Sequence, residues 1–249
     1  MVITHTEKHR WIKKIDSFIL NDFGKNNTKK IQALLSDVAT STITYSFSLL
    51  TKEHVDWFES LYNANLATKH NPQPYDVYKT TLGKDVINHP YYILSLTEQG
   101  THIGGTIFTL RKDRLSMVYR TYPSTWIHNT FKCSPALYAE YLATEYAVLQ
   151  NKPYLVHGID FNPYGVHSNV GVAIFKLSIG CHPEIKSEYP LIHTDLNSLP
   201  FNSLILEAPV PGTHITEAYL IGDDETAQKY EQLFKYPERL HINLYTPTV

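Results

Sequence analysis

One short apolar segment, residues 154–159, is followed closely by side chains of the kinds that move protons. His157 and Asp160 lie at its end, and Asn162 and Tyr164 follow in a polar stretch. Histidine titrates near neutral pH and is the natural base for a protonated amine. Asp160 would orient His157 or bind the amine, while the Tyr164 hydroxyl would protonate a leaving group. We therefore predict His157, Asp160 and Tyr164 as catalytic residues, and Asn162 as a substrate-binding residue.

The same residues also fit a purely structural interpretation. Asp160 suits an Asx turn that leads into the dipeptide Asn162-Pro163, because short polar side chains bond to the backbone two residues on. Tyr164 suits a loop tyrosine that packs on the edge of a sheet. Both interpretations stay open at the level of the sequence.

A long helix over residues 135–150 is the next element with chemical content. Ser134 is a suitable N-cap, and Pro135 stands at the first helical position. The amide groups at this end attract anions, so Ser134 is predicted to take part in cofactor binding. Glu140 and Thr144 form a narrow polar stripe on a helix that is otherwise apolar almost all round. Solvent is the favoured surrounding for this stripe, and a cleft, with Glu140 binding substrate, is the alternative.

A second, shorter helix is predicted over residues 170–179, with Gly180 as its stop. Lys176 on this helix is predicted to bind a phosphate or carboxylate of donor or acceptor. The alternative is a lysine whose stem lies along the surface and whose ammonium reaches water.

Other motifs are incomplete. His5 and His9 are spaced i, i+4 but lack the HExxH order, and they sit at a terminus expected to be loose. No histidine spacing suggests zinc, and no GxSxG, Walker A or GxGxxG occurs. Cys133 and Cys181 are too far apart for a CxxC motif, and a structural thiol is expected at Cys133. We predict no metal.

Composition excludes several classes of protein. The chain has 249 residues, a formal charge of −2, 43% hydrophobic and 18% charged residues, which is ordinary for a folded soluble protein. No apolar run approaches the roughly 20 residues of a membrane-spanning helix, and the first ten residues lack a secretory signal. The expected location is therefore the cytoplasm. The near-neutral charge argues against a DNA-binding protein.

Periodicity predicts a mixed order of elements along the chain. Three strand-like segments with short links predict an antiparallel meander, and a strand that follows a helical crossover implies a parallel pair. The expected helices are two within residues 1–40, then 52–66 capped by Thr51, 75–87, 135–150, 170–179 and 223–234. The expected strands are 41–50, 91–96, 103–110, 115–122, 154–159, 190–193, 203–207, 215–220 and 240–245.

We predict one domain over residues 1–249, because no linker interrupts the chain. Residues 1–40 would form an N-terminal helical extension, 41–212 the core, and 213–249 a C-terminal strand-helix-strand extension. The last segment would close the sheet, cover a cleft or make a homodimer contact.

This order of elements resembles the acyltransferase fold of the GNAT superfamily, and most closely its FemAB-like branch with its single-domain relatives. Residues 91–183 carry the resemblance. Three segments support it: Ile103-Gly104-Gly105-Thr106, the capped helix with the strand after it, and residues 169–176 with the Gly180-Cys181 pair that follows them. The resemblance implies an α/β fold with a mixed, mostly antiparallel sheet. It also implies one parallel, splayed strand pair, flanking helices and, here, the additional N-terminal helices.

The resemblance also implies where an acyl donor would bind. In that fold the donor carbonyl lies against the last meander strand, which makes Tyr119, Arg120 and Thr121 the predicted cofactor-binding residues, with a backbone N–H as oxyanion donor. Most GNAT enzymes carry an Arg/Gln-x-x-Gly-x-Gly/Ala loop before the long helix. The corresponding segment here, 125–134, has no glycine.

The expected function is therefore N-acyl transfer from acetyl-CoA, another acyl-CoA or a similar thioester. The acceptor would be the primary amine of a small molecule, sugar or peptide, attacking directly. Two alternatives stay open: an aminoacyl-tRNA-dependent FemAB-like transferase, and a non-catalytic member of the fold that binds a ligand or partner.

Overall fold

The computed structural model describes residues 1–15, 19–36, 42–67, 74–83, 89–123, 133–166, 168–186, 188–208 and 214–248. These residues form two compact units. We call Ile15–Leu155 the central unit, and Met1–Lys14 together with Val156–Val249 the terminal unit. The division falls elsewhere than the predicted boundaries after residues 40 and 212. The assignment of one domain stays a prediction.

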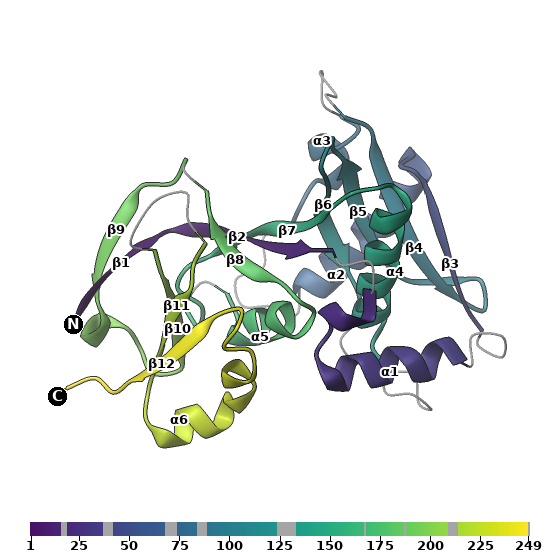
Figure 1. Cartoon of the computed structure of the whole chain (residues 1–249). Coiled ribbons are helices and arrows are strands. Elements are labelled where there is room, and N and C mark those ends of the chain that lie inside the picture. The colour runs from purple at the N-terminus through teal and green to yellow at the C-terminus, as the bar shows by residue number, and fades with distance from the viewer. Residues whose placement is uncertain are drawn as a thin grey trace. The chain divides into compact units, whose positions relative to one another are not determined.

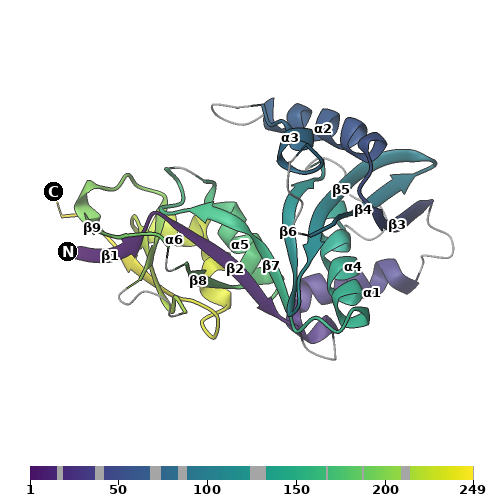
Figure 2. The ribbon, with the colours of Figure 1, turned by 90° about the horizontal axis from the view of Figure 1, so that it is seen from above.

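The central unit is built on four antiparallel strands in the order β3-β4-β5-β6. Helices cover both faces of these strands, with α2 and α3 on one side and α1 and α4 on the other (Figures 1 and 2). The strands are β3 (Ile43–Leu49), β4 (Tyr91–Glu98), β5 (Thr101–Leu110) and β6 (Arg114–Thr121). The helices are α1 (Lys25–Ser36), α2 (Lys52–Ala67), α3 (Val77–Thr80) and α4 (Pro135–Leu149), preceded by the short η1 (Ile19–Asp22).

The predicted meander is confirmed, and its links explain why. Gln99 and Gly100 both adopt positive φ values, of 50° and 80°, in the tight turn between β4 and β5. At the other link, the Arg111 amide donates to the carbonyl of Arg114 across a separation of 2.8 Å. Short turns of this kind can join only antiparallel neighbours.

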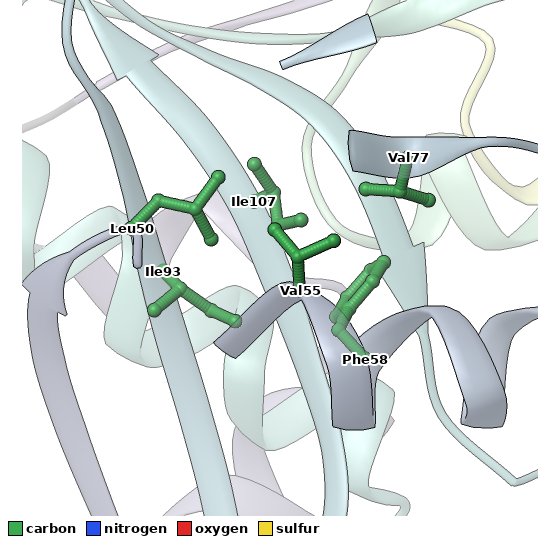
Figure 3. Close-up of a cluster of buried hydrophobic side chains, with 6 residues drawn as sticks. All are labelled: Leu50, Val55, Phe58, Val77, Ile93 and Ile107. Atoms are coloured by element: carbon green, nitrogen blue, oxygen red, sulfur yellow. The ribbon is translucent and has the colours of Figure 1, made fainter. Parts of the chain in front are cut away.

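A buried apolar cluster fastens α2 to the strands of the central unit (Figure 3). Val55 and Phe58, one turn apart on α2, face Ile93 of β4 and Ile107 of β5. Thr51 precedes this helix, and its Oγ1 accepts a hydrogen bond from the His54 amide at 3.4 Å. The predicted cap is thus confirmed, and the apolar stripe faces the core.

The long helix α4 begins as the sequence predicts. The Oγ of Ser134 accepts a hydrogen bond from the Leu137 amide at 3.2 Å, and Pro135 is the first helical residue. The prediction that solvent surrounds the polar stripe of this helix is wrong, because Glu140 and Thr144 are both fully buried. A polar stripe on the helix surface looks the same in sequence whether water or a partner side chain covers it.

The terminal unit consists mainly of strands, and β1 and β2 pair with strands far along the chain. β1 pairs antiparallel with β9, β2 with β8, and β10 with β11, while β11 and β12 run parallel. β7 neighbours β2. The strands are β1 (Val2–Thr6), β2 (Lys8–Lys14), β7 (Tyr154–Phe161), β8 (His182–Ile185), β9 (Leu191–Asp195), β10 (Ser203–Glu207), β11 (Glu217–Ile221) and β12 (His241–Tyr245). The helices are α5 (Val170–Ser178), α6 (Asp224–Lys229) and the short η2 (Leu196–Ser198) and η3 (Glu231–Lys235).

Both units confirm the predicted mixed α/β class, with mostly antiparallel sheets flanked by helices. The parallel, splayed pair predicted between residues 115–122 and 154–159 would join the two units, and it stays a prediction. In the terminal unit, Gly180 follows α5 with a φ of 97°, which confirms it as the stop of that helix.

The first of the two predicted N-terminal helices is wrong. Residues 2–6 and 8–14 are strands, and of the two expected helices the described residues form the second, α1. Trp11 fits a helical stripe with later apolar residues, but His9, Trp11 and Lys13 are all fully buried at every second position. That period of two belongs to a strand, and pairing with β8 on the far side of the sequence stabilises it.

Two further helices are shorter than predicted. The helix expected over 75–87 is the single turn α3 followed by a turn in which the Gly83 amide donates to the Tyr78 carbonyl; residues 84–88 lie outside the described residues. The helix expected over 223–234 breaks at Tyr230 into α6 and η3. Strands β1, β2 and β8 were not predicted, because their partners are distant in sequence.

Candidate functional site

The polar residues predicted at the last meander strand surround an irregularity in β6. Opposite β5, Ile107 pairs with Tyr119 and Phe108 pairs with Met117, so Val118 stands opposite no residue of β5. Such a β-bulge bends the strand and re-aims its side chains, and bulges are frequent beside active sites. Tyr119 and Arg120, which follow the bulge, are half-buried.

Arg120 joins β6 to the long helix. Its Nη1 lies 3.3 Å from Oε2 of Glu140, and its Nη2 donates to the carbonyl of Ala136 at 3.2 Å. The Glu140 side chain is fully buried and the Arg120 side chain is 19% exposed. A carboxylate this deep needs a cation, because burial of an isolated charge is very costly. The ion pair therefore explains the buried acid on α4.

The neighbours of Arg120 are engaged in hydrogen bonds within the central unit. The Tyr119 hydroxyl lies 2.8 Å from Oγ1 of Thr80, and Thr121 Oγ1 accepts from the Asn65 amide group at 2.6 Å. Tyr122 is hydrogen-bonded to Thr106 at 2.8 Å, and burial raises the pKa of Tyr122 well above its usual range. The side chains of this strand are thus held in fixed positions.

The Gly104-Gly105 pair of β5 leaves room for these side chains. A Cβ on Gly104 would lie 2.3 Å from Cδ1 of Tyr122 and 2.6 Å from the carbonyl oxygen of Thr121. A Cβ on Gly105 would lie 2.9 Å from the Trp57 ring. Because contacts this short do not occur, glycine is required at both positions of β5, where the rings of Tyr122 and Trp57 pack against the backbone.

Ser134 acts as the N-cap of α4, and the segment before it, 124–132, lies outside the described residues. Cys133 is a free, buried thiol, and burial raises its pKa to about 11. A thiol with that pKa is protonated at neutral pH and is a weak nucleophile. A buried, protonated thiol agrees with the structural role expected for Cys133, which stays a prediction.

The terminal unit holds a second polar cluster, centred on Tyr164. This side chain is fully buried, and its hydroxyl donates to Oδ2 of Asp160 at 2.9 Å. The hydroxyl oxygen accepts from Nε1 of Trp11 at 2.7 Å and lies 2.8 Å from Nε2 of His9. The backbone of Tyr164 is bonded in both directions to Leu204, which fixes the loop on β10.

The hydrogen bonds around Tyr164 assign the protons of His9. A tyrosine hydroxyl has one hydrogen, and here it points to Asp160, so the contact with His9 must be donated by Nε2–H of the imidazole. Burial lowers the pKa of His9 to about 4, so the ring is neutral at pH 7 and Nδ1 carries no proton. His9 Nδ1 is buried and has no hydrogen-bond partner among the described residues.

His9 and Trp11 were not predicted as site residues. They lie on β2, in a stretch expected to be loose or helical, and not in a loop beside Tyr164. The signal that could have found them is the alternation of His9, Trp11 and Lys13, since period two with large and polar residues on one face indicates a buried strand.

The other predicted residues of the terminal unit are buried as well. His157 and Lys176 are 1% and 8% exposed. Asn162 accepts from the Leu206 amide at 3.0 Å and donates to the carbonyls of Leu206 and Thr6 at 2.9 and 3.3 Å. These bonds use most of its hydrogen-bonding capacity, so its evident role is to tie the loop to β1 and β10. His157 and Asp160 are three residues apart on β7 and therefore face opposite sides of the strand.

The ten predicted site residues thus fall into two groups, one in each unit. Within the central unit, Arg120 and Glu140 meet, and within the terminal unit, Asp160 and Tyr164 meet. The predicted pairing of His157 with Asp160 is replaced by pairing of Asp160 with Tyr164. The central group is Tyr119, Arg120, Thr121, Ser134 and Glu140, and the terminal group is His157, Asp160, Asn162, Tyr164 and Lys176.

The described residues show neither a cluster of metal ligands nor a membrane-spanning helix. No three side chains among His, Cys, Asp and Glu gather there in a way that would hold a metal ion. No described helix has the length and apolar character needed to cross a membrane.

Comparison with known proteins gives likeness in structure only. No family profile matches the chain, and no curated protein matches its sequence. Among solved structures, FemX is 11% identical with a TM-score of 0.49, over 71% of this chain and 59% of its own. L-PGS from Bacillus licheniformis is 13% identical with a TM-score of 0.42, over 72% and 54%. A GCN5-related N-acetyltransferase from Kribbella flavida is 11% identical with a TM-score of 0.32, over 77% and 59%.

The chain therefore spans between one half and three fifths of the length of these three proteins.

Proposed function

We propose that this chain is an acyltransferase that moves an acyl group to a primary amine. The amine nitrogen attacks the donor carbonyl, a C–N bond forms, and a tetrahedral oxyanion results. Collapse of this intermediate breaks the bond to the leaving group, which departs as a thiolate or ribose oxygen and takes up the proton lost by the amine. The reaction needs a backbone or side-chain donor for the oxyanion.

The observation that carries this proposal is the bulge at Val118. It interrupts the pairing of β6 with β5 at one point, and Val118 is 39% exposed. A bulge of this kind leaves one residue outside the regular ladder with β5, and we propose that the amide of this residue donates to the carbonyl oxygen of the acyl donor. Tyr119, Arg120 and Thr121 then line the donor site, and their fixed hydrogen bonds keep it preorganised.

The donor in this proposal is an acyl-CoA or a similar thioester, with an aminoacyl-tRNA as the alternative. The formal charge of −2 makes a small thioester the more favourable of the two, because binding of tRNA requires a basic surface. We propose that Ser134 and the amides at the start of α4 contact a phosphate of the donor.

A second candidate function, a non-catalytic ligand-binding or partner-binding protein, is favoured by a different observation. Hydrogen bonds and the ion pair within the chain already engage Arg120, Thr121, Asn162 and Tyr164. A protein that had lost catalysis would retain such contacts for stability alone.

The test uses the purified full chain with a panel of acyl-CoAs and, separately, aminoacyl-tRNAs, against polyamines, amino sugars and peptides. Mass spectrometry would detect the acylated amine. Val118→Pro removes the amide hydrogen at the bulge, and Val118→Ala keeps it, so the two variants form a matched pair. We expect Val118→Pro to lower kcat by about 10²-fold, the cost of one oxyanion donor, and Val118→Ala to change it by less than about threefold.

Each outcome is decisive when both variants give the wild-type circular dichroism spectrum. Equal turnover by Val118→Pro and Val118→Ala would place the oxyanion site elsewhere. Product from tRNA donors alone would replace the thioester by the alternative donor. Absence of product and of thermal stabilisation with every donor would favour the non-catalytic candidate.

A further inference from the structure

Asp160 ends the buried cluster of the terminal unit, and only one of its carboxylate oxygens is used. Oδ2 accepts the hydrogen bond of Tyr164. In the part of the chain that the structure describes, Oδ1 accepts no hydrogen bond, and no lysine, arginine or histidine forms an ion pair with this carboxylate. The side chain is half-buried, so it is reached by solvent from one side.

We propose that Asp160 binds the protonated amine of the acceptor and that Tyr164, Trp11 and His9 are positioning residues that hold its carboxylate. The inference rests on the proposed function and gives it an amine site in the terminal unit. The ligand class is a primary ammonium group, as in an amino sugar, a polyamine or a peptide amine.

The geometry of Tyr164 makes it a rigid support. Its oxygen accepts two N–H groups, from Trp11 and His9, and its hydrogen goes to Asp160, so the full capacity of a hydroxyl is used. The rings of His9 and Tyr164 meet edge to face, with centroids 5.5 Å apart. Two donors on one oxygen polarise the O–H bond and strengthen the hydrogen bond that it donates.

The Tyr164 proton stays on the tyrosine. Burial and the nearby Asp160 charge raise the pKa of Tyr164 well above its usual range. Because His9 is neutral as well, the cluster supplies hydrogen bonds to Asp160 but no positive charge. The carboxylate is oriented without being neutralised, which leaves its charge for a ligand.

A cation is the ligand that this arrangement fits. A half-buried carboxylate is shielded from part of the solvent, so a charge-assisted N⁺–H···O⁻ bond to Oδ1 is stronger there than on an open surface. Three buried polar side chains, those of His9, Trp11 and Tyr164, would be an expensive way to build a core, since replacing hydrogen-bonded partners by apolar groups of similar shape is nearly neutral or stabilising. These side chains hold Oδ2 of Asp160 in place, and this orients Oδ1 toward a ligand.

The first experiment measures binding of Nα-acetyl-lysine amide, which carries one primary amine, by calorimetry or NMR titration. Its Nε-acetylated analogue is the neutral control ligand. We expect the wild-type chain to bind the free amine about tenfold more tightly than the analogue, and Asp160→Asn to abolish this difference. Asp224→Asn, an exposed carboxylate on α6 in the same unit, is the matched control and should keep it.

The second experiment tests the positioning residues. Tyr164→Phe removes the hydroxyl, and Trp11→Phe removes one N–H while keeping an aromatic ring. We expect both to weaken binding of the free amine, by about fivefold and twofold, without changing binding of the analogue. Tyr230→Phe is the matched control, because Tyr230 lies in the same unit and its hydroxyl forms no hydrogen bond with any described residue.

The outcomes separate this inference from the proposed function. Equal binding of the amine by wild type and folded Asp160→Asn overturns the amine site, even if acyl transfer occurs. Loss of amine binding in Asp160→Asn without any acyl transfer supports the site and contradicts the function. If Tyr164→Phe does not fold, Asp160→Glu replaces it as the second variant. Moving the carboxylate by one methylene should weaken amine binding, and unchanged binding would count against positioning.

Discussion

The central and terminal units each bury a polar cluster, but they treat charge in opposite ways. In the central unit, a fully buried carboxylate, Glu140, is paired with a guanidinium, Arg120. In the terminal unit, the buried members Tyr164, Trp11 and His9 are neutral, and the one charged member, Asp160, lies at the part-exposed end.

This difference predicts what each cluster can do. A buried charge that is already paired contributes mainly to the stability of the fold, because removing either partner leaves the other charge buried and uncompensated. A charge that is held by neutral groups stays available to a ligand. In the two proposals above, the central cluster would form the rigid wall of a donor site, and the terminal cluster would bind a cation.

The largest effect on stability is expected at the ion pair. Arg120→Met should lower the free energy of unfolding by about 3 kcal/mol or more, because it removes this guanidinium from a buried carboxylate. Urea denaturation would measure it. The double variant with Glu140→Gln should recover much of the loss, since the buried charge is then absent. A double variant as unstable as the single one would show that the charge is not what matters.

The next effect concerns pH and the neutrality of the terminal cluster. The pKa of His9 is about 4 in the folded chain and near 6.5 when unfolded, so the unfolded state binds the extra proton first. The contribution of His9 to stability is therefore complete above pH 6.5 and is lost as pH falls toward 4, by about 3 kcal/mol. Desolvation is the main cause, Asp160 opposes it and Lys176 adds to it.

His9→Gln is the matched variant for this pH dependence, because glutamine retains an N–H donor but does not titrate. Denaturation curves at pH 4.5 and 7 should show a smaller difference in unfolding free energy for His9→Gln than for the wild type. The same difference in both proteins would mean that His9 is charged in the folded state.

The smallest of the three effects is expected from Tyr164→Phe. This variant leaves two buried N–H groups, of Trp11 and His9, without their acceptor, which should cost about 2 kcal/mol in the free energy of unfolding. Thermal or urea denaturation would measure it against Tyr230→Phe. If Tyr164→Phe lowered the free energy of unfolding as much as Arg120→Met does, the neutral cluster and the charged cluster would not differ in the way proposed here.

Much of the central unit could be read from local patterns. The Thr51 and Ser134 caps and the glycine at position 100 act on residues within a few positions, so periodicity and turn chemistry locate the elements there. The terminal unit was harder to predict, because β1 and β2 pair with β9 and β8 across most of the chain. Pairing energy of that kind leaves little trace in the local sequence.

The candidate site shows the same limit. Asp160 and Tyr164 were predicted as site residues because they follow the strand expected over 154–159. His9 and Trp11 could not be connected with Tyr164, because more than 150 residues separate them from it. The burial of Glu140 was missed for a related reason. An acid on a helix looks solvent-exposed until the arginine that pairs with it is placed beside it.

Local composition and spacing therefore decided the helix caps, the meander and which polar side chains were present. The tertiary structure alone decided which of them meet, which are buried and which keep a free charge. The physical reason is that capping and turn formation depend on near neighbours, while desolvation and ion pairing depend on side chains brought from distant strands.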